Sequence, residues 1–172
     1  DHVKVKDVYG ITVACGKDQW TNVYQDTMPQ SARYDDYKCS NITLGLYQDS
    51  MVVNAQSQFP TFIQLRRFFY KPTSAEDAYA YMEGYRQIAF VDLISADYED
   101  VPTYQDISLN GYAAKYFTAV TGGSRTPAGI REVYMFYYNG TIYGVIVNVY
   151  DKHKSEDSYE KCLEVIKTLK LK

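Results

Sequence analysis

The sequence predicts one α+β domain over residues 1–172, an α/β/α sandwich around a central, mainly antiparallel sheet. Asn139-Gly140 separates two runs rich in β-branched and aromatic residues, 132–138 and 141–150. This is the strongest short-range hairpin signal, because both central residues of a type I′ turn need positive φ. Both runs are apolar at successive positions, which indicates strands covered on both faces. Two amphipathic helices are available to cover them.

Pairing across the Asn-Gly turn sets the two faces of this hairpin. Tyr138 is expected opposite Thr141, and alternation then divides the other side chains between the faces. One face is expected to carry Ile130, Tyr134, Phe136, Tyr143, Val145, Val147 and Val149. The other is expected to carry Val133, Met135, Tyr137, Ile142 and Ile146. Two apolar faces place the hairpin near the middle of the sheet.

The N-terminal third predicts shorter strands. One strand is expected within 3–14, and the polar stretch 21–40 is expected to form either a surface loop or a short helix. Runs 42–47 and 51–55 predict a second hairpin across Gln48-Asp49-Ser50.

A strand over 62–70 precedes the first predicted helix. Thr73 with Glu76, or Ser74 with Asp77, matches the reciprocal capping pair of a helix start. Residues at helical spacing are expected to form its buried stripe: Ala78, Met82, Tyr85 and Ala89.

The C-terminal half begins with an acidic linker, 95–106. A strand over 107–120 is expected to bulge or kink at Asn110-Gly111, and 121–129 is a loop by composition. Ser155 is expected to cap the last helix. Its predicted apolar stripe is Tyr159, Cys162, Leu163, Ile166 and Leu169.

Composition indicates a folded domain of 172 residues with 46% hydrophobic and 23% charged residues. The formal charge of -3 argues against a general affinity for nucleic acid or acidic membranes. The sequence has no apolar run near the roughly 20 residues that a membrane span needs. The chain begins at Asp1 without methionine, which fits removal of a leader and equally fits a trimmed boundary.

Three cysteines fit no metal-ligand spacing. Cys162 lies on the apolar side of the last helix and is expected to be a buried thiol. Cys15 and Cys39 are able to pair if the protein is exported, and the sequence leaves this open.

Few residues suggest chemistry. The two histidines have no neighbour at ligand spacing, and the sequence predicts no cofactor. The acidic segment 92–106 offers a weak candidate metal site at Asp97, Glu99 and Asp100, although a solvated loop explains it better. The same segment allows an alternative, a small hydrolase with Asp97 and Asp100 as acid and base. Arg66 and Arg67 follow each other on a strand and are expected to point to opposite faces, with at most one of them paired with a carboxylate.

Tyrosine is abundant, at 19 of 172 residues. The tyrosines in loops or at strand ends are candidate ligand-binding residues: Tyr34, Tyr37, Tyr47, Tyr98 and Tyr104. Most of them flank carboxylates, a combination of rings and acceptors that suits a sugar or a basic peptide. The alternative is that these rings fold back and cover the sheet edges.

The chain resembles the PsbP-like family, which includes a photosystem subunit, a Ran-binding import factor and bacterial lipoproteins. The resemblance rests on four short motifs: Tyr9-Gly10-Ile11-Thr12-Val13 with Trp20, Leu109-Asn110-Gly111-Tyr112-Ala113-Ala114, the Asn139-Gly140 hairpin, and Ile166-Lys167-Thr168-Leu169-Lys170. It implies the sandwich fold and, from the bacterial members, a non-catalytic exported or surface-anchored protein. It implies no active-site residues, because the family has no shared catalytic motif.

The expected function is therefore a binding or structural module for a protein or glycan partner. The scarcity of histidine and the lack of a nucleophile motif favour binding over catalysis. The alternatives are the carboxylate hydrolase and an intracellular partner-binding protein.

Overall fold

The computed structural model describes residues 3–8, 10–28, 37–91, 102–122 and 127–172. The strands are β1 (Val3–Val8), β2 (Ile11–Gly16), β3 (Trp20–Met28), β4 (Cys39–Leu46), β5 (Met51–Val53), β6 (Gln56–Gln58), β7 (Thr61–Phe68), β8 (Gln105–Leu109), β9 (Tyr112–Thr121), β10 (Gly129–Tyr138), β11 (Thr141–Tyr150) and β12 (Lys170–Leu171). The helical elements are the 3-10 turn η2 (Tyr47–Asp49), α1 (Ala75–Val91) and α2 (Ser158–Ile166).

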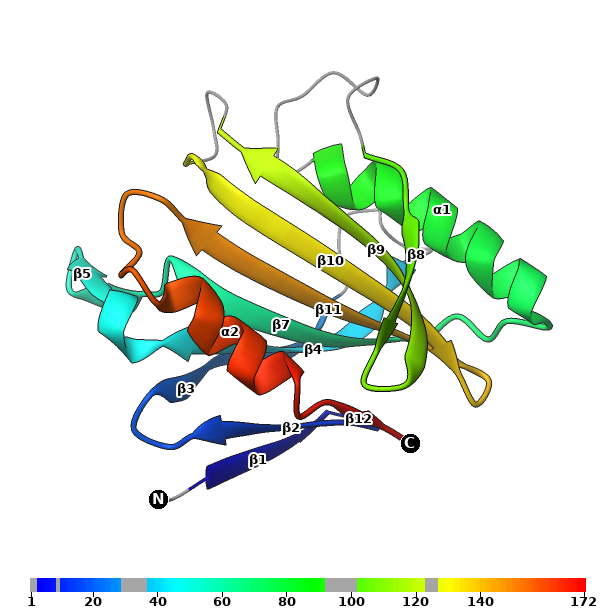
Figure 1. The fold of residues 1–172 in the computed structure, drawn as a ribbon, viewed down its shortest axis with the longest axis horizontal. Coiled ribbons are helices and arrows are strands. Elements are labelled where there is room, and N and C mark those ends of the chain that lie inside the picture. The colour runs from blue at the N-terminus through cyan, green and yellow to red at the C-terminus, as the bar shows by residue number, and fades with distance from the viewer. Residues whose placement is uncertain (1–2, 9, 29–36, 92–101, 123–126) are drawn as a thin grey trace.

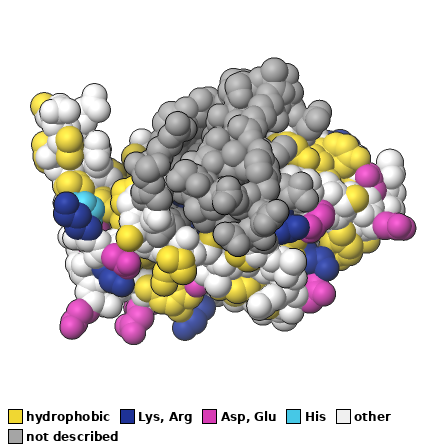
Figure 2. Space-filling view, turned by 90° about the horizontal axis from the view of Figure 1, so that it is seen from above, with side chains coloured by type: hydrophobic (Ala, Val, Ile, Leu, Met, Phe, Trp, Pro, Cys, Tyr) yellow, Lys and Arg dark blue, Asp and Glu magenta, His cyan; other side chains and the backbone are white. Residues whose placement is uncertain are grey.

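A seven-stranded antiparallel sheet, in the order β3-β4-β7-β11-β10-β9-β8, forms the middle layer (Figure 1). Helix α1 covers one face, and α2 covers the other together with a small sheet, β1-β2-β12. The predicted α+β sandwich is confirmed, with the small sheet completing one outer layer. In Figure 2, acidic and basic side chains are interspersed along the described part of one side, in keeping with the small net charge.

The Asn-Gly hairpin lies in the middle of the large sheet, as predicted. Asn139 and Gly140 have φ of 50° and 80°, and Tyr138 lies opposite Thr141. The two predicted faces belong to separate apolar clusters, here called the α2-side core and the α1-side core. Ile130, the second residue of β10, is the exception at 40% exposed and does not belong to the α2-side core.

The start of α1 follows the capping pattern of Ser74 and Asp77. The Asp77 backbone N–H donates to Ser74 Oγ at 3.0 Å, and the Asp77 carboxylate accepts from the Thr73 N–H at 2.9 Å. Ala78, Met82 and Tyr85 are buried as predicted, whereas the side chain of Ala89 lies outside the described residues.

A second Asn-Gly hairpin replaces the predicted kink within 107–120. Asn110 and Gly111 have φ of 54° and 85°, close to the values of the central turn. They join β8 to β9 with Leu109 opposite Tyr112. The prediction of a bulge or kink within one strand was wrong, since two successive positive φ angles reverse the chain.

Three predictions for the N-terminal third were wrong. Gly10, with φ of 112°, divides the first predicted strand into the hairpin β1–β2. Residues 21–28 continue β3, which pairs with β4 and forms one edge of the large sheet. β4 pairs with β3 and β7, and β5 pairs with β6. Asp49, in the η2 turn between β4 and β5, is buried and accepts from the Ser155 backbone N–H at 3.0 Å.

Asp49 also explains why α2 begins later than predicted. Its carboxylate accepts from Ser155 Oγ at 2.8 Å and from Ser158 Oγ at 2.6 Å, so Ser155 does not cap the helix. The buried face contains Val165 in place of Leu163, while Tyr159 is 37% exposed. Beyond α2 the chain forms β12 on β2, which the predicted longer helix did not include.

The three cysteines are reduced, buried thiols. Cys15 belongs to the α2-side core and Cys39 to the α1-side core, on opposite faces of the large sheet, so no disulfide joins them. Cys162 is buried as predicted, and burial raises the pKa of its thiol. Within the described ranges, neither helix combines the length and apolar character needed to cross a membrane.

Candidate functional site

Three of the five candidate tyrosines fall within the described residues. These are Tyr37, Tyr47 and Tyr104, whereas Tyr34 and Tyr98 lie outside the described ranges. The structure places the three described tyrosines in two separate parts of the molecule.

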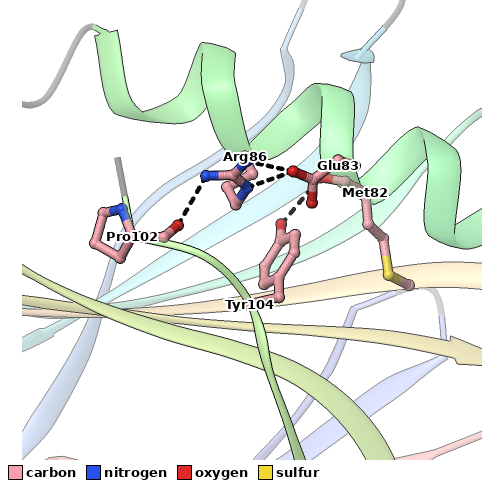
Figure 3. A network of polar contacts seen from close by, with 5 residues as sticks. All are labelled: Met82, Glu83, Arg86, Pro102 and Tyr104. Atoms are coloured by element: carbon pink, nitrogen blue, oxygen red, sulfur yellow. Dashed lines mark hydrogen bonds and ion pairs between the residues drawn. The ribbon is translucent and has the colours of Figure 1, made fainter. Parts of the chain in front are cut away.

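Tyr104 links the segment before β8 to α1 through a hydrogen bond (Figure 3). Its hydroxyl donates to the Met82 carbonyl at 3.1 Å, and burial raises its pKa well above the ordinary value. One turn further on, Arg86 pairs with Glu83 and donates to the Pro102 carbonyl at 2.9 Å. These contacts hold two segments of the fold together and leave the Tyr104 hydroxyl engaged with the backbone.

The other two described tyrosines lie apart from each other. The Tyr37 ring packs 4.9 Å from the ring of Tyr81 on α1. Tyr47 is 46% exposed on η2, with its ring 6.2 Å from that of Phe59. Its neighbour Gln48 hydrogen-bonds Asp157 at the start of α2, so Tyr47 lies on the other side of the sheet from α1. The described candidates therefore do not form one groove.

The carboxylate hypotheses fall mainly outside the described residues. Asp97, Glu99 and Asp100 lie outside the described ranges, and Asp106 is exposed and pairs with Lys115 at 2.5 Å. Among the side chains that the structure describes, no group of three could ligate a metal ion. The metal and hydrolase hypotheses stay predictions from sequence.

A buried polar cluster on the α1-side face was not predicted. Alternation on β4 and β7 directs Ile42, Leu44, Ile63 and Leu65 into the α2-side core. The intervening residues therefore face α1, and they are polar: Asn41, Thr43, Gln64 and Arg66. On β10 and β11 the same face carries Arg131 and Asn148 beside its apolar residues.

Arg66 is held by three neutral acceptors. Its Nε donates to Asn41 Oδ1 at 3.1 Å, Nη1 to the Tyr85 hydroxyl at 2.6 Å, and Nη2 to Gln64 Oε1 at 3.2 Å. Tyr85 reaches the guanidinium from α1, so the cluster lies between the sheet and this helix. A guanidinium has five N–H donors, and these three acceptors leave capacity for a further ligand.

Arg131 is the more deeply buried of the two arginines, at 5% exposed. Its Nε donates to Asn148 Oδ1 at 3.2 Å, and its guanidinium lies 5.9 Å from the ring centre of Phe62. Asn148 is fixed in turn by donating to the Pro60 carbonyl at 3.1 Å. Burial, with repulsion from Arg66 as a further cause, lowers the pKa of Arg131 to about 10.

Among the described residues, Arg66 and Arg131 contact no carboxylate. No ion pair joins Arg66 or Arg131 to any aspartate or glutamate within the described part of the chain. Buried arginines are ordinarily paired, because an isolated buried charge costs several kcal/mol. A buried guanidinium at Arg131 and a partly buried one at Arg66, both among amide and phenol groups, form an environment that favours an anion.

Sequence reasoning noticed Arg66 only as a strand residue and missed Arg131. The available signal was the interruption of an apolar face. Arg131 and Asn148 are polar on the hairpin face that otherwise carries Val133, Ile142 and Ile146. Polar residues at cross-strand positions of a buried face indicate a candidate site.

Neither a family model nor a curated protein sequence matches this chain. Among solved structures it is similar to a protein from Bacteroides thetaiotaomicron VPI-5482, with a TM-score of 0.53 and 8% sequence identity. The match covers 99% of this chain and 48% of that protein, so the chain spans about half of its length. This likeness shows the fold alone. The PsbP-like resemblance and the exported or surface location stay predictions.

Proposed function

We propose that this protein is a non-catalytic binding module that holds its ligand by an anionic group between Arg66 and Arg131. The observation that carries the proposal is a pair of guanidinium groups, buried at Arg131 and partly buried at Arg66, whose described partners are all neutral. A carboxylate, phosphate or sulfate group offers the missing charge and fits the planar donor geometry of arginine.

The groups around the arginines favour binding over catalysis. The neighbours are amides and a phenol, which orient a ligand but are poor bases at neutral pH. The one thiol nearby is Cys39, and burial, opposed by Arg66, raises its pKa. A raised pKa keeps the thiol protonated, which argues against a nucleophilic role.

The proposal changes the ligand chemistry expected from sequence. Tyrosine rings beside carboxylates suit a neutral sugar or a basic peptide. The arginine cluster suits the acidic equivalents, an anionic glycan or a carboxylate-bearing small molecule. Both remain ligands of a binding module.

Thermal unfolding tests the proposal without knowledge of the natural ligand. The probes are sodium phosphate, sulfate and citrate at constant ionic strength, with sodium chloride as the reference salt. An anion at 100 times its Kd stabilises the folded state by about 2.7 kcal/mol. For a chain of this length the unfolding midpoint then rises by roughly 5–10 °C.

Arginine variants separate specific binding from a general salt effect, because sulfate and phosphate stabilise many proteins by exclusion from the surface. Arg66→Met and Arg131→Met are expected to remove the saturable part of the rise. Arg67→Met is the matched control, since Arg67 follows Arg66 on β7 and faces the other side. An equal rise in all four proteins would contradict the proposal.

A further inference from the structure

Glu132 forms a second buried charge on the α2-side face. It is 5% exposed, and its carboxylate accepts from the Tyr134 hydroxyl at 2.8 Å and from the Tyr159 hydroxyl at 2.5 Å. The Tyr116 ring lies 4.9 Å from that of Tyr134. Burial and the interaction with Glu132 raise the pKa of Tyr116 to about 12. Three tyrosines from two strands and a helix thus surround one carboxylate.

The described contacts of this carboxylate are all with neutral groups. No lysine or arginine in the described ranges forms an ion pair with Glu132. The three phenol groups are neutral donors, so they solvate the negative charge without cancelling it. Tyrosine rings add attraction for a cation that approaches their faces. The chemistry of the cluster therefore suits an ammonium or guanidinium group.

The surface beside Glu132 is open and apolar. Thr118, its cross-strand neighbour on β9, is exposed. One step further along, Val120 and Ile130 face each other across β9 and β10, at 80% and 40% exposed. Helix α2 packs on β2, β7 and β11, and in Figure 1 it crosses in front of β7 and does not extend over β9. Exposed apolar side chains beside a polar centre are typical of a protein interaction surface.

We propose that this surface, formed by Tyr116, Thr118, Val120, Ile130 and Tyr159 over the buried Glu132 carboxylate, docks a partner polypeptide through a lysine or arginine side chain. The cationic group pairs with Glu132 between the tyrosine rings, and apolar residues next to it in the partner cover Val120 and Ile130. The apolar flank favours a polypeptide over a free cation, since a small ammonium ion would leave both side chains exposed. This surface lies on the other face from the arginine site, so it is independent of the proposed function.

Chemical-shift titration with short peptides tests the docking surface. The probe is Ac-Gly-Ile-Lys-Val-Gly-NH2, and the reference peptide carries Glu in place of Lys. The lysine peptide is expected to shift backbone amide signals of β9 and β10 saturably, whereas the glutamate peptide does not. Glu132→Gln is expected to weaken binding roughly tenfold, the ratio that corresponds to about 1.4 kcal/mol. Glu160→Gln, at an exposed position next to Tyr159, is the matched control and leaves the affinity unchanged.

A second variant covers the case in which Glu132→Gln fails to fold. Thr118→Lys changes an exposed residue and places an ammonium group opposite Glu132, so it is expected to block the lysine peptide. The proposal is overturned if the lysine peptide gives no shifts at β9 and β10, or if Thr118→Lys and the folded Glu132→Gln bind it like the native protein. Equal affinity for N-acetyl-lysine amide would also overturn it, in favour of a site for small cations.

Discussion

Arg131 and Glu132 are consecutive residues of β10 that carry opposite charges into opposite faces of the large sheet. Each is 5% exposed. Arg131 donates to Asn148 on the α1 side, whereas Glu132 accepts from Tyr134 on the α2 side. Neither forms an ion pair within the described part of the chain. One strand thus supplies a cationic site on one face and an anionic site on the other.

The burial of Arg131 without a carboxylate predicts a gain in stability when its charge is removed. Arg131→Met keeps most of the volume and abolishes the desolvation cost, so the free energy of unfolding is expected to rise by about 1–3 kcal/mol. Urea unfolding measures this change. Arg86→Met is the control, because Arg86 is also buried but pairs with Glu83, and its loss is expected to destabilise the protein. Equal destabilisation by both substitutions would show that Arg131 is a structural residue.

The raised pKa of Tyr116 predicts a pH-dependent effect of Tyr116→Phe. The folded protein holds the phenol neutral to about pH 12, whereas the unfolded chain ionises near pH 10. The folded state then binds more protons than the unfolded state, so the contribution of this group is complete below pH 10 and is lost as pH rises through 12. From pH 10 upward, the free energy of unfolding of the native protein is therefore expected to fall relative to that of Tyr116→Phe. A difference that stays constant between pH 8 and 12 would contradict the raised pKa.

The two Asn-Gly turns predict similar costs for substitution of their glycines. Gly111 and Gly140 have φ of 85° and 80°, and an added Cβ meets no atom within 4 Å at either position. The cost is therefore conformational, about 1 kcal/mol for alanine and roughly 1–2 kcal/mol for Gly140→Val. Urea unfolding of the three variants checks this. Native stability in Gly111→Ala and Gly140→Ala would show that the left-handed conformation is not required.

The buried face of α2 predicts unequal effects of its apolar residues. Ile166 is 1% exposed, and Ile166→Ala is expected to lower the free energy of unfolding by roughly 2–5 kcal/mol. Leu163 is only half-buried, so Leu163→Ala is expected to cost clearly less. The ratio of the two values tests the helix orientation. A larger loss for Leu163→Ala would restore the orientation expected from sequence.

The architecture was predictable where one local signal agreed with a long apolar pattern. The Asn139-Gly140 turn lies between two apolar runs, and both its register and its faces followed. The same dipeptide at 110–111 was predicted to kink a single strand. The strand before it, β8, is short and half-exposed, so its sequence alone does not distinguish it from the beginning of β9.

The late start of α2 depends on a contact that no local pattern contains. Asp49 and Ser158 are 109 positions apart in sequence, and the bond between them decides which serine starts the helix. The arginine site and the Glu132 site could not be predicted from sequence for a similar reason. Arg131 and Glu132 are ordinary strand residues in sequence, and only burial without an opposite charge distinguishes them.

Side-chain NMR of the arginines tests the anion site most directly. The Nε–H signals of Arg66, Arg67 and Arg131 report on each guanidinium separately during titration with sodium phosphate, sulfate or citrate at constant ionic strength. The predicted result is a saturable shift of the Arg66 and Arg131 signals at one common Kd, with the Arg67 signal unchanged. Unmoved signals for Arg66 and Arg131, or an equal shift of all three, would contradict the presence of an anion-binding site under α1.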